Sequence, residues 1–298
     1  MNYSIGTTYE GKNFRYLQEI APFVNHIEVS PDSIANRKKD FVCINEEALK
    51  HLKWIENETD ISILVHGVGM SIGSYDGCSK EYLQLINELF NKIKKIRWHS
   101  EHLAYTMVNG ENLGTMLTLP KTDEVIDMIC RRVEAIQKKY KIPFLLENVI
   151  SMLPSPSFEY SDAAFLNKIT GLTGCGLILD VYNLECDKVN FNLDVELFLQ
   201  ELNLNTVCEM HLAGGSTDAE FNFQMDVHLG LVAESTLKLA TEIIQANPLN
   251  LKAITFEILE EFIANHGSHK IINELKKLTS IFNDHEPAAI TDTSMFLN

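Results

Sequence analysis

The chain has 298 residues, of which 45% are hydrophobic, and its 41 acidic side chains outnumber 25 basic ones to give a net charge of −16. This length and composition fit a folded protein of one large or two smaller domains and argue against a disordered chain. The acidic excess repels phosphate backbones, which argues against nucleic acid as a partner. There is no apolar run of about 18 residues, no signal sequence and no CxxC spacing among the six cysteines. We therefore expect a reduced, cytoplasmic protein without a membrane span.

Short β-rich runs alternate with helical patterns along the whole chain. The predicted strands are residues 3–8, 24–30, 61–69, 96–105, 142–149, 176–183, 206–214 and 253–259. Between them, apolar residues spaced by three and four predict helices, most clearly over 80–96, 122–140, 194–203 and 232–247. This alternation predicts a single (β/α)8 TIM barrel over residues 1–284, followed by a polar C-terminal tail at 285–298. An open doubly wound sheet is the alternative.

The third to the eighth predicted strands each end on a side chain that can bind a metal ion: His66, His102, Glu147, Asp180, His211 and Glu257. In a (β/α)8 barrel the carboxyl ends of the strands converge on one mouth, so residues far apart in sequence become neighbours. Asp226 and His228 lie in a polar loop after the seventh strand and extend the set. Burying such groups is costly unless they are paired or bound to a cation. The pattern therefore predicts a metal site.

The number and chemistry of these candidates indicate the kind of metal site. Eight ligands exceed the three or four that a single catalytic zinc ion uses. Shared carboxylates such as Glu147 and Asp180 could bridge metal ions roughly 3.5–4 Å apart. Nitrogen and oxygen ligands without thiolate suit iron, manganese or zinc. We therefore expect a multinuclear site.

Three polar residues near the strand ends have other expected roles. The amide oxygen of Asn183 could serve as a ligand or orient a substrate, whereas Asn148 is expected to brace its loop. Glu28, at the end of the second predicted strand, could line the substrate site at the mouth or form a salt bridge at its rim.

Alternation along a strand separates further residues from the metal site. His99 lies three residues before His102 and so points to the opposite face, which predicts a structural role. Glu101 also faces away from His102, and we expect it to support the site rather than to bind metal. His26 is expected to be structural.

The segments HGVGMSIGS, SEHLAY, LLENV, LILDVYN, EMHLAGG, MDVHLG and a late FE occur in this order between residues 60 and 260. In order and spacing they resemble the motifs of the DUF692 proteins, also called UPF0276. This is the family of multinuclear non-haem iron-dependent oxidases that modify ribosomally made peptides, and it includes a methanobactin biosynthesis oxidase. A wider resemblance runs to xylose-isomerase-like barrels, which include a DNA-repair endonuclease group.

The DUF692 resemblance implies that the eight candidate ligands bind two or three iron ions in a mixed Fe(II)/Fe(III) state. Asp226 and His228 would serve the most exposed ion, with Asn183 nearby. The resemblance also implies O2 as co-substrate, a Cys-containing precursor peptide as substrate, and a separate partner protein that recognises the leader of that peptide. One departure is the segment EVSPDS, where the Glu-x-x-x-Glu-Asn run of many members is reduced to Glu28.

Two other functions stay open at this point. A zinc- or manganese-dependent hydrolase or sugar isomerase would use the same barrel and ligands, and turnover without oxygen would distinguish it. A non-enzymatic protein that binds metal or a partner would lose only metal binding when Glu147 or His211 is replaced. Eight ligands are more than simple metal storage requires.

Overall fold

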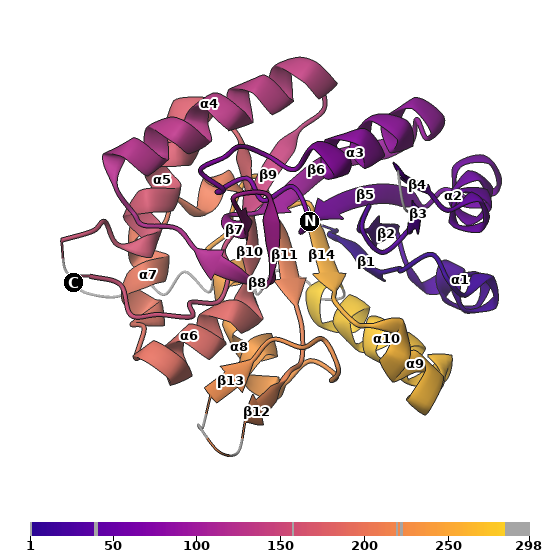
Figure 1. Cartoon of the computed structure of the whole chain (residues 1–298). Helices are drawn as coiled ribbons and strands as arrows, with labels where there is room; N and C mark the ends of the chain where they lie inside the picture. Colours follow the sequence, from indigo (N-terminus) through magenta and orange to yellow (C-terminus); the bar gives the residue numbers. More distant parts are fainter. Residues whose placement is uncertain (1, 39–40, 157, 219, 221–222, 284–298) are drawn as a thin grey trace, which may run out of the picture.

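The structure, a computed structural model, describes residues 2–38, 41–156, 158–218, 220 and 223–283. Its centre is a closed barrel of parallel strands (Figure 1). Around the barrel these are β1 (Ser4–Thr8), β14 (Ala253–Phe256), β11 (Val207–Leu212), β10 (Gly176–Asp180), β9 (Phe144–Glu147), β6 (Ile96–His102), β5 (Ser62–Gly67) and β2 (His26–Val29). Because β1 pairs with both β2 and β14, the barrel sheet has no edge. The predicted barrel is confirmed, and the open doubly wound sheet is excluded.

Helices cover the outside of the barrel (Figure 1). They are α1 (Phe14–Ile20), α2 (Glu46–Glu58), α3 (Lys80–Lys92), α4 (Asp123–Tyr140), α5 (Asp162–Thr173), α6 (Val181–Phe191), α7 (Val195–Glu201), α8 (Glu234–Gln245), α9 (Glu260–His266) and α10 (Ser268–Asn283), with short 3-10 turns at Ala21–Phe23 and Leu204–Thr206. The four helices expected from apolar spacing are confirmed as α3, α4, α7 and α8. In α4, for example, Ile126, Ile129 and Val133 are buried at the spacing that turns one face toward the barrel.

In two predicted strands, the last residues belong to the next element of the chain. The strand predicted over 96–105 is β6, which ends at His102, and a separate strand β7 (Ala104–Val108) follows. The strand predicted over 176–183 is β10, which ends at Asp180. There the Asp180 carboxylate accepts a hydrogen bond of 2.6 Å from the backbone N–H of Asn183 and caps α6. Asn183 therefore lies in the first turn of a helix and not in a strand.

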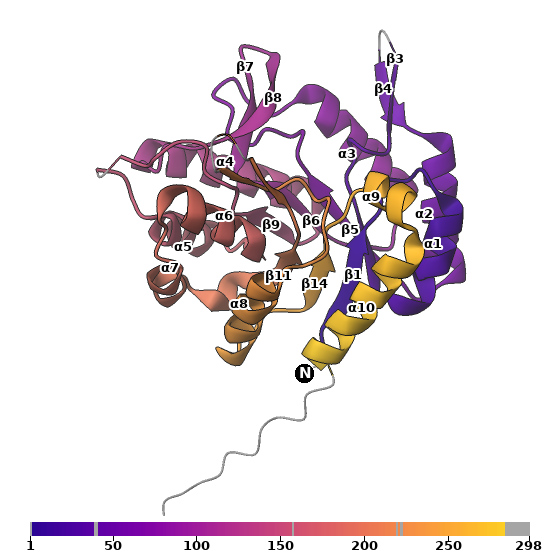
Figure 2. The same ribbon diagram turned by 90° about the horizontal axis from the view of Figure 1, so that it is seen from below.

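Antiparallel hairpins follow three of the barrel strands. They are β3 (Ala35–Lys38) with β4 (Phe41–Ile44), β7 with β8 (Glu111–Thr118), and β12 (Ser216–Asp218) with β13 (Phe223–Met225). Because they follow β2, β6 and β11, the hairpins leave the barrel at the carboxyl ends of its strands. Figure 2 shows β3–β4 and β7–β8 projecting from the same end of the barrel. The sequence did not predict the hairpins, since β8 is exposed over residues 111–115 and has no buried face there.

The barrel interior contains an apolar cluster, formed by Leu64, Trp98, Leu145, Ile178 and Ala253. Each of these residues precedes a candidate ligand by two or four positions, and the ligand lies on the same strand or directly follows it. Because side chains alternate along a strand, the apolar residue and its ligand both face the barrel axis. These apolar side chains therefore lie in the barrel interior next to the candidate ligands.

The sequence also predicts a chain without a membrane span and a polar tail after the barrel. Among the described residues, no helix has the length and apolar character needed to cross a membrane. The polar tail at 285–298 lies outside the described residues. The division of the chain at residue 284 stays a prediction.

Candidate metal centre

The structure brings all eight candidate ligands together at the carboxyl end of the barrel. His66, His102, Glu147, Asp180 and His211 lie in the last two residues of their strands, and Glu257 directly follows β14. Asp226 and His228 reach the same place from the loop after β13. The side chains form overlapping groups whose ligand atoms lie within 4.8 Å of one another. The first group is His66–His102–Glu147, the second is Glu147–Asp180–His211–Glu257, and the third is Asp226–His228–Glu257, while a set of His66, His211 and Glu257 overlaps all three.

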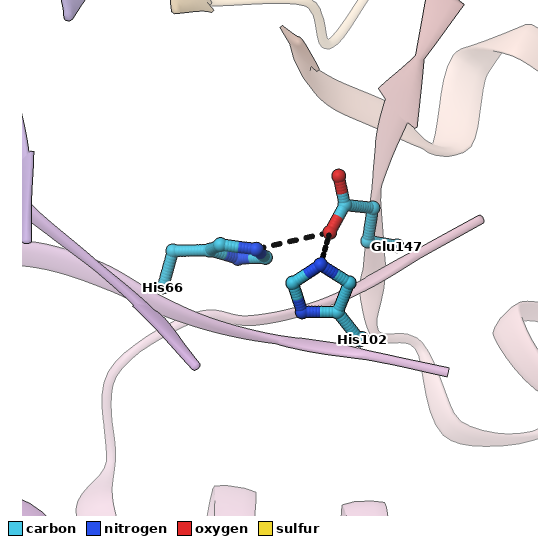
Figure 3. A group of neighbouring side chains, drawn as sticks. All are labelled: His66, His102 and Glu147. Carbon is cyan, nitrogen blue, oxygen red and sulfur yellow. Dashed lines mark ion pairs between the residues drawn. The ribbon is translucent and has the colours of Figure 1, made fainter. Parts of the chain in front are cut away.

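The first group joins His66, His102 and Glu147 (Figure 3). Nε2 of His66 lies 3.0 Å from Oε2 of Glu147, and Nε2 of His102 lies 3.1 Å from the same oxygen. Nδ1 of His102 donates to the carbonyl of Gly67 at 2.8 Å. Nδ1 of His66 lies 2.9 Å from the hydroxyl of Ser100, which itself donates to a carbonyl. When the two rings are neutral, each therefore carries its proton on Nδ1. The lone pairs of the two Nε2 atoms and of Oε2 of Glu147 then face one another.

The second group shares Glu147 with the first. Nδ1 of His211 lies 3.0 Å from Oε1 of Glu147 and 3.3 Å from Oε1 of Glu257. The two oxygens of Glu147 thus face different histidines, as a bridging carboxylate requires. Asp180, which we also expected to bridge, uses Oδ1 to cap α6, and only its Oδ2 has no partner among the described residues.

The third group, Asp226, His228 and Glu257, is the most open. Nε2 of His228 lies 2.8 Å from Oδ2 of Asp226 and 3.5 Å from Oε2 of Glu257. The side chains of His228 and Asp226 are 25% and 13% exposed. Glu257 turns Oε1 to His211 and Oε2 to His228. It therefore links the second and third groups in the way that Glu147 links the first and second.

The electrostatics of these groups reflect a surplus of buried carboxylates. Burial lowers the pKa of His66, but the carboxylates of Glu147 and Glu28 together outweigh it, and the pKa is raised to about 9. Burial, with the carboxylate of Asp226 beside it, raises the pKa of Asp180 well above its ordinary value. In both cases a proton offsets negative charge that a metal cation would otherwise offset.

Buried oxygen atoms without partners provide a test of whether the residues fit metal ions. Among the described residues, Oε2 of Glu147, Oδ2 of Asp180, Oδ1 of Asn183 and Oδ1 of Asp226 are buried and accept no hydrogen bond. Leaving such an acceptor unsatisfied costs about 1–3 kcal/mol each. Cation binding would satisfy them, and a nitrogen–oxygen donor set suits iron, manganese or zinc. The residues therefore fit a group of such ions.

The neighbouring polar residues differ in how far they match expectation. Asn148 accepts from the backbone N–H of Asp180 at 2.8 Å and donates to its carbonyl at 3.0 Å, so the expected bracing role is confirmed. Asn183 donates through Nδ2 to the carbonyl of Asn148 at 3.1 Å, which leaves its Oδ1 available. Glu28 is 1% exposed and faces His211, which excludes a salt bridge at the rim. The substrate-lining roles of Asn183 and Glu28 stay predictions.

Two residues of β6 point away from the site, as expected. His99 packs against the rings of Phe90, Tyr140 and Phe144 between the barrel and its helices. Burial lowers the pKa of His99 to about 3, so the ring is neutral. Glu101 lies beside Gly67, where an added Cβ would meet both its Oε2 and the hydroxyl of Tyr82 on α3. It therefore faces the helical layer and does not support the metal ligands directly.

One residue of the site was missed from the sequence. Glu209 is fully buried and lies 3.6 Å from Nε2 of His211. It stands two residues before His211 in the segment EMH, so alternation alone places both side chains on one face. A search that covered whole strands, and not only their last residues, would have found it.

Helix α6, which carries Asn183, is tied to the loop after β9 through Asp187. The backbone N–H of Ser151 donates to Oδ1 of Asp187 at 2.8 Å, and its hydroxyl donates to Oδ2 at 2.9 Å. Asp187 is only 9% exposed, and burial raises its pKa to about 6. Because this exceeds the ordinary value, the folded chain binds the proton more tightly than the unfolded chain does.

The Asp187→Asn variant is expected to be more stable than the wild type above pH 6. The stability contributed by Asp187 is greatest below pH 4 and falls as the pH rises to about 6, at a total cost of up to about 3 kcal/mol. Asparagine has no charge to bury and keeps an acceptor for the Ser151 N–H. Urea unfolding at pH 4 and pH 8 would measure this, and an equal difference at both pH values would contradict it.

Comparison with known proteins identifies the family. A family described as "RiPP precursor modification enzyme MbnB/TglH/ChrH" matches residues 4–282. A UPF0276 protein of Rhizorhabdus wittichii is 33% identical over 156 residues, 52% of this chain and 55% of that protein. A UPF0276 protein of Shewanella loihica is 28% identical over 213 residues, 72% of this chain and 73% of that protein. The first of these matches spans only about half the length of the relative.

Solved structures agree on the fold. D-psicose 3-epimerase from Clostridium cellulolyticum H10 has a TM-score of 0.58 at 10% identity over 94% of this chain and 98% of that one. The IOLI protein, solved with a zinc atom, has a TM-score of 0.54 at 13% identity, and the match covers 95% of this chain and 99% of that one. At these identities the likeness shows the fold alone, which is a TIM barrel of the xylose-isomerase-like type. The family match begins at β1, ends in α10 and includes every candidate ligand, and the chain belongs to the family of RiPP precursor modification enzymes named for MbnB, TglH and ChrH.

Proposed function

We propose that the protein is a multinuclear non-haem iron oxidase that uses O2 to modify one or more cysteine residues of a ribosomally synthesised precursor peptide. Membership of a family that modifies such precursors supports the peptide substrate. The observation that carries the metal part is the sharing of Glu147 and Glu257 among converging histidines. When bound, two or three iron ions in a mixed Fe(II)/Fe(III) state would supply electrons for O2 and a place for a cysteine thiolate.

Different residues of the centre would hold different metal ions. His66, His102 and Glu147, which are all buried, would hold one ion. The lone pairs of the two histidines are already turned inward, since their Nδ1 atoms bond to the protein. Asp226 and His228 would hold the ion nearest solvent, where a substrate could reach an open position.

Space of the size of a ligand site lies near the hairpins β3–β4 and β7–β8, which leave the barrel at the carboxyl ends of its strands. Two cavities of about 510 and 520 Å³ share Asp32, Gly69 and Asn112 in their walls. Gly69 lies in the loop after β5, the strand that carries His66, so this wall is at the carboxyl end of the barrel. Cavities of about 300–1,000 Å³ are typical of ligand sites. We place the precursor segment here, and a separate partner protein would recognise its leader.

The test is the mass of a Cys-containing precursor peptide after incubation with iron-loaded protein in air. The proposal expects a mass change on a Cys-containing fragment that requires iron, O2 and the cysteine. Zinc-loaded protein, anaerobic samples and a Cys→Ser peptide serve as controls. No change with any precursor encoded beside the gene, with the leader-binding partner present, would overturn the peptide-oxidase function.

A zinc- or manganese-dependent hydrolase or sugar isomerase is the second candidate function. The structural likeness to sugar epimerases, one of the similar structures being solved with a zinc atom, is the observation behind it. This function predicts turnover under anaerobic conditions with zinc or manganese in place of iron. The anaerobic arm of the same experiment, repeated with ketohexose substrates, distinguishes the two.

A further inference from the structure

His211 is held between two pairs of carboxylates. On one side, its Nδ1 faces Oε1 of Glu147 at 3.0 Å and Oε1 of Glu257 at 3.3 Å. On the other side, its Nε2 faces Oε2 of Glu28 at 3.3 Å and Oε1 of Glu209 at 3.6 Å. The first pair belongs to groups that contain several other candidate ligands, whereas the second pair is grouped with His211 alone.

Glu209 is fixed in place by donors from two other barrel strands. Nε1 of Trp98 on β6 donates to Oε2 of Glu209 at 2.7 Å, and the hydroxyl of Thr255 on β14 donates to Oε1. Nε2 of His26 on β2 lies 2.8 Å from the Thr255 hydroxyl and orients it in turn. All of these side chains are buried. Glu209 cannot turn away from His211 without breaking a buried hydrogen bond.

This arrangement decides which nitrogen of His211 carries the proton. Ionised carboxylates accept hydrogen bonds and cannot donate them, so a neutral ring places its proton toward Glu28 and Glu209 when the other nitrogen meets a cation. Nδ1 then presents its lone pair to the side where Glu147 and Glu257 converge. We infer that Glu28 and Glu209 are positioning residues that hold His211 in the Nε2–H form and aim Nδ1 at a metal ion. This inference rests on the proposed metal centre.

Variants of Glu28 separate the loss of the acceptor from the loss of charge. Glu28→Leu removes the acceptor but keeps a similar volume in a buried place. Glu28→Gln can still turn its carbonyl oxygen to Nε2, because Oε1 of Glu28 has no partner among the described residues that would fix the amide. Removing such a support typically weakens metal binding 10- to 100-fold. We expect about this loss for Glu28→Leu and a much smaller loss for Glu28→Gln.

Glu209→Gln is a second, independent variant. Its single carbonyl oxygen can satisfy Trp98 or Thr255 but not both, and the N–H of Trp98 cannot accept a hydrogen bond. The amide oxygen is therefore expected to stay with Trp98, which turns the NH2 group toward Thr255 and His211. A donor then faces Nε2, and metal affinity is expected to fall as in Glu28→Leu. If either variant fails to fold, the other still tests the inference.

The experiment titrates the metal-free full chain with Zn²⁺ and reads the ring nitrogens of 15N-labelled histidines by NMR. The wild type is expected to bind Zn²⁺ with His211 protonated on Nε2. Glu28→Leu and Glu209→Gln should lose one ion or bind it about 10- to 100-fold more weakly. Glu274→Gln is the control, since Glu274 is also buried but pairs with Lys277 on α10 at 3.3 Å.

The outcomes distinguish this inference from the metal centre itself. A wild type that binds no Zn²⁺, Mn²⁺ or Fe²⁺ would overturn the proposed metal centre. A wild type that binds metal together with variants of unchanged affinity and His211 spectrum would overturn only the positioning role. An Nε2 that carries metal instead of a proton would also overturn it, because Glu28, Glu209 and His211 would then form a metal site of their own.

Discussion

The Glu147→Gln variant is expected to lose metal from two groups of ligands at once. Oε2 of Glu147 faces His66 and His102, while Oε1 faces His211. Glutamine keeps one carbonyl oxygen but replaces the other carboxylate oxygen by an NH2 group, which cannot bind metal. Because this NH2 group can donate a hydrogen bond to a histidine nitrogen, the variant is expected to fold. We expect at least one ion fewer per chain and a fall in peptide turnover on the order of 1,000-fold, since a metal ion contributes several kcal/mol to such a reaction.

Metal analysis and Mössbauer spectra of anaerobically purified protein would measure this loss. The matched control is Glu101→Gln, a buried glutamate on the neighbouring strand β6 whose carboxyl faces α3. Burial raises the pKa of Glu101 well above its ordinary value, so the neutral amide resembles the form already present. Full metal content in Glu147→Gln would contradict the bridging role, and equal loss in both variants would point to a disturbed barrel.

The His228→Asn variant is expected to release the exposed ion alone. His228 has a left-handed backbone with φ of 51°, a region that asparagine adopts more readily than most residues, so the substitution does not strain the loop. Its Nε2 contacts Asp226 and Glu257 but neither His66 nor His102. We expect the loss of one ion, retention of the others, and a fall in peptide turnover on the order of 100-fold or more.

The iron content per chain, compared with that of wild type and of His269→Asn, would check this result. His269 is an exposed histidine of α10 and belongs to none of the groups of candidate ligands. Complete loss of iron in His228→Asn would show that the three groups bind cooperatively. Unchanged iron would remove His228 from the ligand set.

Much of the fold and of the site could be predicted because both depend on local pattern. Barrel strands such as β5, β9, β10 and β14 are short runs rich in apolar residues, as expected of parallel strands that are buried on both faces. His66, Glu147 and His211 stood out because an ionisable residue interrupts such a run at its end. Barrel geometry then brings the ends together without any information on individual contacts.

What could not be predicted depends on contacts between distant residues. Asn183 was placed in a strand because its neighbours are apolar, whereas capping by Asp180 starts a helix there. The shared role of Glu257 follows from which way its two oxygens turn, and no spacing rule encodes this. Glu28 was expected either to line the substrate site at the mouth or to form a salt bridge at its rim, and its burial against His211 depends on a contact that local sequence does not indicate.

The closure of the barrel between its first and last strands has a consequence for the order of events in the cell. Residues 4–7 pair with residues 253–256, and Glu257 follows only one residue later. Contacts so distant in sequence form late in folding, because a long loop must close first. During synthesis, a ribosome-bound chain can expose some of its histidines long before Glu257 exists. Complete metal loading is therefore expected to follow release of the finished chain, and a chain truncated before β14 should capture metal poorly.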